Sequence, residues 1–358
     1  MDAEAHFNQG LAHADKGQWD EAIADFTKVV ELAPGAANAY CNRAIAYGKK
    51  HKHDAAIADY TRAIKLNPRM AEAYCNRGNT YHTLGDYDAA IADSTKAIQL
   101  NPNFAIAYNN RGNAFADKGD YGAAIADCTK AIELDPNLAL AYNSRGAAYA
   151  RESDHDAAIA DYTKAIELDP NSAMPYCNRA NAYARKRDYD AAIADCSKAI
   201  ELDPQYAMAY CNRGTAYSKK GEYNTAMTDY TKAIGLDPQY AMAYCNRGDA
   251  RNELGDYHAA IADSSQAIEL DPNLAEAYFN RAWAYAKVGE HDAAITDLAK
   301  AIELNPADAE AYSDRAVAHF RRRDYDTAWA DVKECQRLGG TVDPEFLAEL
   351  RKASGREE

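Results

Sequence analysis

The sequence predicts an all-α fold built from ten consecutive helix pairs. Nine of the 11 prolines recur every 34 residues, from Pro34 to Pro306, and the twentieth residue of every 34-residue unit is alanine. A fixed period of this length indicates a repeat protein rather than a conventional multidomain enzyme. Counted from Ala3 within a single array, 1–342, the repeats are 3–36, 37–70, 71–104, 105–138, 139–172, 173–206, 207–240, 241–274, 275–308 and 309–342.

The first half of each repeat has the residue spacing of a helix. In repeat 71–104, the residues expected to pack recur at i, i+3, i+4 and i+7 from Tyr74 to Tyr81, which is the helical period. Gly85-Asp86 then interrupts the pattern, and glycine next to aspartate is typical of a turn.

The second half of each repeat predicts another helix. Small and apolar residues extend from Ala89 to Ile98, and Asn101-Pro102 ends the pattern because proline cannot continue a helix. The eighth residue of each repeat is Gly or Ala, whereas tyrosine prevails at the fourth and eleventh positions. Small residues opposite large ones let two helices pack closely as an antiparallel pair.

A short helix is predicted after the last repeat. It extends from Pro344 to Lys352, and its apolar residues Phe346 and Leu350 fall on one side. We expect it to cover the open face of the tenth pair, so that residues 343–358 form a C-terminal capping helix and a loose tail.

These residues resemble the tetratricopeptide repeat, which has an aromatic residue, Gly or Ala, Tyr, Ala and Pro at the same spacing over 34 residues. The resemblance covers 3–342. It implies a right-handed α-solenoid superhelix in which the first helices line a concave groove and the second helices form the convex side.

Composition restricts the classes of partner. The net charge is −15, with no basic stripe, so we expect no nucleic-acid partner. No apolar run reaches the ~20 residues that span a bilayer, and no secretory signal is visible at the amino terminus. We therefore expect no membrane insertion and a cytoplasmic location. The eight cysteines recur at positions that stacked helices place roughly 8–10 Å apart, beyond the about 7 Å that a disulfide spans, so we expect free thiols.

Arginine and aspartate recur together at two repeat positions. The seventh residue is arginine in nine repeats, where the family usually has leucine, and Gln9 in the first; the twenty-third is always aspartate. A packed guanidinium needs a bidentate acceptor, which a carboxylate supplies. We expect each aspartate to pair with the arginine of the following repeat, since the first repeat then needs no arginine. The alternative is that the arginines bind an anionic ligand.

Asparagine at the sixth position is the main candidate for ligand binding. A carboxamide offers a donor and an acceptor, which match an extended backbone. Repeats spaced roughly 10 Å apart would meet a strand rising about 3.3 Å per residue, or about three ligand residues per repeat. The predicted peptide-binding asparagines are Asn42, Asn76, Asn110, Asn178, Asn212, Asn246 and Asn280, with Ser144 interrupting the series and Asp314 ending it.

This series resembles the asparagine ladder in the superhelix of O-linked N-acetylglucosamine transferases, which holds extended peptides. Only a short tail follows Lys352, so the resemblance does not extend to a catalytic domain. Two alternatives stay open: a bond within the repeat that braces the Tyr-x-Asn-Arg turn, or duplication of a neutral residue. The carboxylate clamp of co-chaperones also uses this asparagine. Its lysines are missing from the second and fifth positions, so we do not expect a chaperone tail as the ligand.

Methionine and cysteine predict a soft apolar strip in the groove, and methionine surfaces adapt to varied apolar groups. Packing filler is the alternative. The strip consists of Met174, Met208, Met242, Cys177, Cys211 and Cys245.

No phosphate loop, nucleophile motif or metal-ligand cluster interrupts the repeats, so we expect no enzyme activity, cofactor or metal. The sequence predicts a protein–protein interaction scaffold or adaptor that binds an extended peptide segment in the groove. The alternatives are a structural scaffold that self-associates as a homo-oligomer and a thiol- or redox-responsive binding module.

Overall fold

The computed structural model describes residues 2–356, which hold 21 α-helices and no strand. The chain forms two compact units, Met1–Ala182 and Tyr183–Glu358, called here the N-terminal and C-terminal halves. None of the helices between residues 2 and 356 is long and apolar enough to cross a membrane. The helices are α1 (Ala3–Asp15), α2 (Trp19–Leu32), α3 (Ala37–Lys49), α4 (His53–Leu66), α5 (Ala71–Thr83), α6 (Tyr87–Leu100), α7 (Ala105–Asp117), α8 (Tyr121–Leu134), α9 (Ala139–Arg151), α10 (His155–Leu168), α11 (Ala173–Arg185), α12 (Tyr189–Leu202), α13 (Ala207–Lys219), α14 (Tyr223–Leu236), α15 (Ala241–Glu253), α16 (Tyr257–Leu270), α17 (Ala275–Val288), α18 (His291–Leu304), α19 (Ala309–Arg321), α20 (Tyr325–Arg337) and α21 (Pro344–Ser354).

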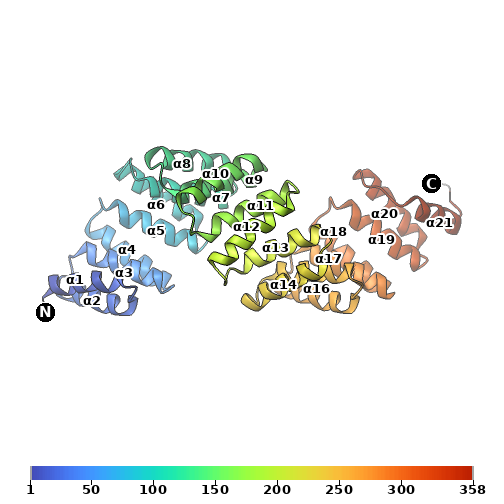
Figure 1. Cartoon of the computed structure of the whole chain (residues 1–358), viewed down its shortest axis with the longest axis horizontal. Helices are drawn as coiled ribbons and strands as arrows, with labels where there is room; N and C mark the ends of the chain where they lie inside the picture. The colour runs from blue at the N-terminus through green and yellow to red at the C-terminus, as the bar shows by residue number, and fades with distance from the viewer. Residues whose placement is uncertain (1, 357–358) are drawn as a thin grey trace. The chain divides into compact units, whose positions relative to one another are not determined.

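Each repeat is a pair of helices joined by a short turn, as Figure 1 shows for α1 with α2 and for α19 with α20. The first helix starts at the first position of the repeat, and the second starts at the seventeenth. Second helices also pack against the first helix of the following repeat, for example α2 on α3 in the N-terminal half and α16 on α17 in the C-terminal half. The predicted all-α architecture of ten helix pairs is confirmed.

The turn inside each pair places the fifteenth residue of the repeat in the left-handed region. Six repeats have glycine there, with φ between 70° and 88°. The other four have side chains at φ of 56–66°, where the Cβ atom crowds the backbone. These four residues are His51, Ser153, Arg187 and Arg323.

Close approach of the two helices in a pair explains the small residues at the eighth and twentieth positions. The twentieth-position alanines are at most 1% exposed. A Cβ atom on Gly112 would lie 3.1 Å from the Ala124 carbonyl oxygen and 2.8 Å from the Cys128 Sγ atom. The two helices therefore approach closely at the small residues, as predicted, but the fourth and eleventh positions do not supply the opposing side chain at Gly112. The side chain that meets the eighth position comes from the twenty-fourth.

The capping helix α21 extends two residues beyond its predicted end. Phe346 and Leu350 pack into the cluster around Trp329, and the Trp329 indole N–H donates to the Ser354 hydroxyl at 3.0 Å. The cap thus buries the last apolar face. The predicted tail includes residues 357–358, which lie outside the described residues.

The tenth repeat has Gly340 where the others have proline, and packing explains the change. A Cβ atom on Gly340 would lie 2.6 Å from the Cβ atom of Ala309 and 2.7 Å from the Sγ atom of Cys335. Cys335 itself replaces the alanine that the second to ninth repeats have at this position. The Cys335 side chain occupies the space that a Cβ atom on residue 340 would need. The two departures from the repeat pattern therefore occur together.

Candidate peptide-binding face

The second, sixth, ninth and thirteenth residues of each first helix share one side of that helix. A helix turns by roughly 100° per residue, so these four positions fall within about 60° of one another. In α13 they are Met208, Asn212, Thr215 and Lys219, all of which are half-buried or exposed. We call this set of positions the stripe.

Apolar side chains at the second position are exposed in five successive repeats. They are 38–48% exposed, and what sets them apart from other exposed leucines is that they recur at one repeat position. Met174, Met208 and Met242 therefore lie on the surface, as the predicted apolar strip requires. Ile106 and Leu140 belong to the same set, which the prediction from methionine alone did not include, although they share its repeat position.

The prediction that three cysteines belong to the exposed apolar strip is wrong. Cys177, Cys211 and Cys245 are at most 2% exposed, because the fifth position is turned about 60° from the second, into the contact between helices. Burial raises the pKa of Cys211 to about 11 and that of Cys245 to about 12. All eight cysteines are free and buried, so the prediction of free thiols is confirmed. Buried, protonated thiols argue against the thiol-responsive hypothesis.

The sixth-position asparagines connect neighbouring repeats. In the N-terminal half, the Asn178 amide donates to the Asn143 Oδ1 atom at 3.0 Å, and the Asn110 amide donates to the Cys75 Sγ atom at 3.4 Å. In each case the acceptor is the fifth residue of the preceding repeat. The asparagines therefore form a structural bond, as the bracing hypothesis expected. The bond joins two repeats, however, and does not brace the turn within one repeat.

The same bond recurs in the C-terminal half. The Asn246 amide donates to the Thr215 hydroxyl at 3.2 Å and lies 3.6 Å from the Cys211 Sγ atom. The Asn280 amide lies 3.4 Å from both the Sγ atom and the carbonyl oxygen of Cys245. Asn42, Asn76 and Asn212 occupy equivalent half-buried positions.

Two repeats have another residue in place of the asparagine, and in each a polar side chain lacks this bond. Ser144 is too short to reach Asn109, whose side chain is fully buried and has no hydrogen-bond partner for either polar atom within residues 2–356. In the tenth repeat, Asp314 faces Phe279 at the acceptor position, and phenylalanine accepts no hydrogen bond.

The arginine–aspartate pairs form within repeats, which corrects the predicted register. Arg145 binds both oxygens of Asp161, at 2.7 and 2.8 Å. Its third contact, Nη1 to the Thr129 hydroxyl at 3.1 Å, reaches the preceding repeat. The pair with Asp161 raises the pKa of Arg145. Positions seven and twenty-three face each other across one helix pair, so the arginines are engaged and the anion-binding alternative has no support.

In the first repeat, which lacks the arginine, two histidines bind the aspartate. Asp25 accepts from His6 at 3.0 Å and from His13 at 2.8 Å. These histidines occupy the fourth and eleventh positions, where most other repeats have tyrosine. Gln9 therefore reflects a histidine pair around Asp25 and not the absence of a preceding repeat.

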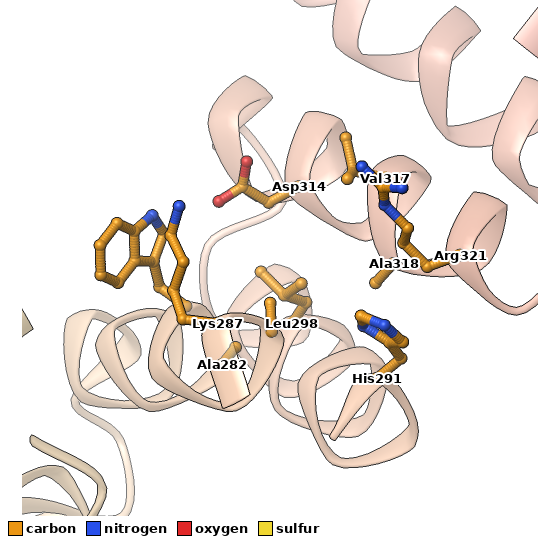
Figure 2. Close-up of a pocket in the computed structure, with 10 residues that line it drawn as sticks. Ala282, Lys287, His291, Leu298, Asp314, Val317, Ala318 and Arg321 are labelled. Atoms are coloured by element: carbon orange, nitrogen blue, oxygen red, sulfur yellow. The ribbon is translucent and has the colours of Figure 1, made fainter. Parts of the chain in front are cut away.

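A pocket of about 320 Å³ opens between the ninth and tenth repeats. Figure 2 shows Asp314 and Lys287 extending toward it from opposite walls, with Ala282 on the same helix as Lys287 and Leu298 beside them. Burial, with the nearby Glu310, raises the pKa of Asp314 to about 6, although Lys287 opposes the shift.

The rest of this pocket combines an aromatic wall with two more ionisable groups. The Lys287 ammonium lies 4.6 Å from the Trp283 ring centroid, as in a cation–π contact. Arg321 and His291 complete the lining, and the buried Nδ1 atom of His291 has no partner among the described residues. The pocket therefore combines an aromatic wall with acidic and basic groups.

A second pocket of about 320 Å³ uses the same repeat positions between the second and third repeats. His53 and Lys49 correspond there to His291 and Lys287, and Asn76 stands in the place of Asp314. Both pockets occur where histidine replaces the larger aromatic residue that most repeats have at position seventeen.

Family models agree with these repeats. The model described as "Tetratricopeptide repeat" matches 37–70, 71–104, 105–138, 139–172, 173–206, 207–240 and 275–308. A second model of that description matches 3–36, and one described as "TPR repeat" matches 248–289. The chain belongs to the tetratricopeptide repeat family. The family's general role, that of a protein–protein interaction scaffold, therefore applies to this tetratricopeptide repeat protein.

Three solved structures are similar to the chain, and the first of them has the same fold. The chain is similar to the crystal structure of the APC/C hetero-tetramer Cut9-Hcn1, at 15% identity and a TM-score of 0.57 over 98% of this chain and 96% of that chain. Yeast Tom70 matches at 17% identity and a TM-score of 0.49, over 99% and 96%. The MamA protein matches at 27% identity and 0.41, over 47% and 92%. A search of curated protein sequences found no match.

Proposed function

We propose that this tetratricopeptide repeat protein is a non-enzymatic scaffold that binds an extended protein segment along the stripe. The observation that carries the proposal is the run of exposed apolar side chains at the second position of five successive repeats. They lie on the same side of their helices as the asparagines. A surface that combines apolar anchors with regularly spaced amides suits an extended peptide.

The asparagines retain hydrogen-bonding capacity for such a ligand. The carboxamide oxygens of Asn110, Asn246 and Asn280 accept no hydrogen bond from the described residues, since these side chains bond through their amide groups. The side chains of Asn42 and Asn76 form no hydrogen bond within residues 2–356. The bracing bonds thus fix the orientation of the carboxamide and leave an acceptor for a ligand amide.

Apolar contacts must supply most of the affinity. Each amide bond contributes roughly 0.5–1.5 kcal/mol net, while ordering each ligand residue costs about 1–2 kcal/mol. Burying one of the exposed methionine or leucine side chains contributes roughly 1–2 kcal/mol more. A dissociation constant on the order of micromolar follows.

The test compares two triple variants in binding to peptides selected from a displayed random library. The first, Ile106→Ser/Leu140→Ser/Met208→Ser, changes the stripe. The matched control, Leu32→Ser/Leu84→Ser/Leu254→Ser, changes leucines that are as exposed but lie outside it.

We expect the stripe variant to lose at least about tenfold in affinity, or ~1.4 kcal/mol, with the control unchanged. Equal affinities for the two variants would contradict the proposal. Sedimentation at several protein concentrations separates the remaining possibility: a mass that rises with concentration, and falls only in the stripe variant, would assign the stripe to self-association.

A further inference from the structure

Cations without partners occupy the thirteenth position of the stripe once in the N-terminal half, at Arg151, and in two consecutive repeats of the C-terminal half, at Arg185 and Lys219. Arg151, Arg185 and Lys219 are exposed and form no ion pair within residues 2–356. Burial raises the pKa of Asp249, and the charge of Lys219 opposes this shift. Lys219 does not form an ion pair with Asp249. Uncompensated cations stand out in a chain with 55 acidic and 40 basic residues.

The neighbouring fourteenth position shows that partners were available. Lys50 binds Asp20 at 2.6 Å, and Lys220 binds Asp190 at 2.6 Å. Lys118 pairs with Asp88 in the same way. Each of these lysines reaches a carboxylate of the preceding repeat. The cations of the stripe point along a different side of the helix and meet no such carboxylate.

Apolar and cationic groups therefore mark opposite ends of the same helix. On α9, Leu140 is 47% exposed and Arg151 lies 11 residues later, a rise of roughly 16 Å. On α13, Met208 and Lys219 have the same relation. A segment that crosses such a helix meets an apolar group along one edge and a positive charge along the other.

Repeat spacing sets the period of the matching ligand. Within the C-terminal half, the second-position side chains Met208 and Met242 recur once per repeat, as do the cations Arg185 and Lys219, roughly every 10 Å. A polyproline II segment has three residues per turn and rises about 3.1 Å per residue. It therefore presents the same side every ~9 Å, whereas a β-strand, with its period of two, does not keep one side on successive repeats.

From this geometry we infer the chemistry of the ligand: a polyproline II segment in which apolar and acidic residues each recur at every third position. The apolar residues contact the second positions, and the carboxylates contact the unpaired cations of the thirteenth. This inference rests on the proposed function and specifies its ligand. Net charge disfavours a nucleic acid, and the stripe of α9 and α13 holds no aromatic side chain on which bases could stack.

Four fluorescent, end-blocked dodecapeptides test the inference by anisotropy with the full chain. Three repeat leucine-serine-X four times, where X is glutamate, glutamine or lysine, and the fourth scrambles the glutamate peptide. We expect the glutamate peptide to bind about tenfold more tightly than the glutamine peptide, with the lysine and scrambled peptides weaker still. Raising the salt concentration should remove the advantage of glutamate.

Two charge-matched variants separate local contact from long-range attraction. Arg185→Gln/Lys219→Gln should weaken binding of the glutamate peptide about five- to tenfold and leave the glutamine peptide unaffected. Lys130→Gln/Lys164→Gln, which removes the same charge from second helices, should leave both peptides unaffected.

The outcomes distinguish the two proposals. Equal binding of the glutamate, glutamine and lysine peptides would overturn the inference and leave the proposed function standing. Equal binding of the ordered and scrambled glutamate peptides would overturn the period of three. Failure of every peptide, including those selected from the library, would overturn the proposed function itself. If single-stranded RNA displaces the peptide, and this competition depends on the stripe cations, the choice of a protein ligand would be overturned.

Discussion

Asn178 donates its side-chain amide to the carboxamide oxygen of Asn143, and this bond joins the first helices of two adjacent repeats. Cysteine accepts in the equivalent places, from Asn110 to Cys75 and from Asn280 to Cys245. The asparagine of the sixth position therefore has a structural task independent of any ligand. Its repetition follows from the need to hold neighbouring repeats in register.

Restoring this bond where it is missing should stabilise the protein. Ser144→Asn would supply the donor that the buried Asn109 lacks, and Asn is accommodated at this position in eight other repeats. We expect the free energy of unfolding to rise by about 1–2 kcal/mol, measured by urea denaturation. Ser144→Ala is the control, with no gain. Identical stabilities of the two variants would show that Asn109 is satisfied in another way.

A double-mutant cycle tests the corrected register of the ion pairs. Arg145→Leu and Asp161→Leu each strand a charge and should each cost about 3–5 kcal/mol, whereas the double variant should cost much less. Asp127 is the partner that the sequence predicted for Arg145. Combining Asp127→Leu with Arg145→Leu should give nearly additive losses. Strong coupling to Asp127, without coupling to Asp161, would restore the rejected register.

The buried carboxyl of Asp314 should make stability depend on pH. Its folded-state pKa of about 6 lies above the ordinary value of 3.8, so the folded state binds more protons between these pH values. Stability from this group is therefore present below about pH 4 and is lost as pH rises through 6.

Asp314→Asn removes that dependence. It should raise the free energy of unfolding at pH 7.5 by about 1–3 kcal/mol, with the difference vanishing near pH 4. Thermal melts across this range measure the effect. The exposed Glu349→Gln serves as the control and should show no such trend. A constant difference between wild type and Asp314→Asn at all pH values would refute the burial of the charge.

The four left-handed residues without glycine are sites of simple stabilisation. His51→Gly and Ser153→Gly relieve a cost of about 1–2 kcal/mol at positive φ and lose about 0.5–1 kcal/mol to the flexibility of glycine in the unfolded chain. We expect a net gain of about 0.5–1 kcal/mol each by denaturant titration. Gly85→Ala, at φ 80°, should lose stability. A gain in Gly85→Ala would mean that the turn is not constrained.

The fold could be predicted from the sequence because the same residue pattern recurs in every repeat. Pro102 marks the end of a helix, and Ala90 and Gly78 mark the close contact between two helices. Equivalent residues recur through the chain, so the repeat boundaries could be derived from the period. The cysteines of the predicted strip show where this approach failed. Repeat position does not reveal burial unless helical angle is considered, and the fifth position turns inward while the second does not.

The partners of side chains were harder to predict than their positions. Gln9 pointed to pairing between repeats, whereas His6 and His13 explain it by bonding Asp25. The acceptors of the asparagine amides were also hidden, since sulfur, hydroxyl and carboxamide groups replace one another there. Such contacts depend on which helix faces lie opposite each other in three dimensions, and the period alone does not contain that information.

Methyl NMR of methionine tests most directly whether the stripe is the binding surface. Met174, Met208 and Met242 lie in the stripe, whereas Met70 and Met227 pack in the hydrophobic clusters around Tyr60 and Tyr230 and serve as internal controls in the same spectrum. Titration with a library-selected peptide should shift the three stripe signals and leave the two controls in place. Shifts confined to Met70 or Met227, with the stripe signals unmoved, would contradict the account.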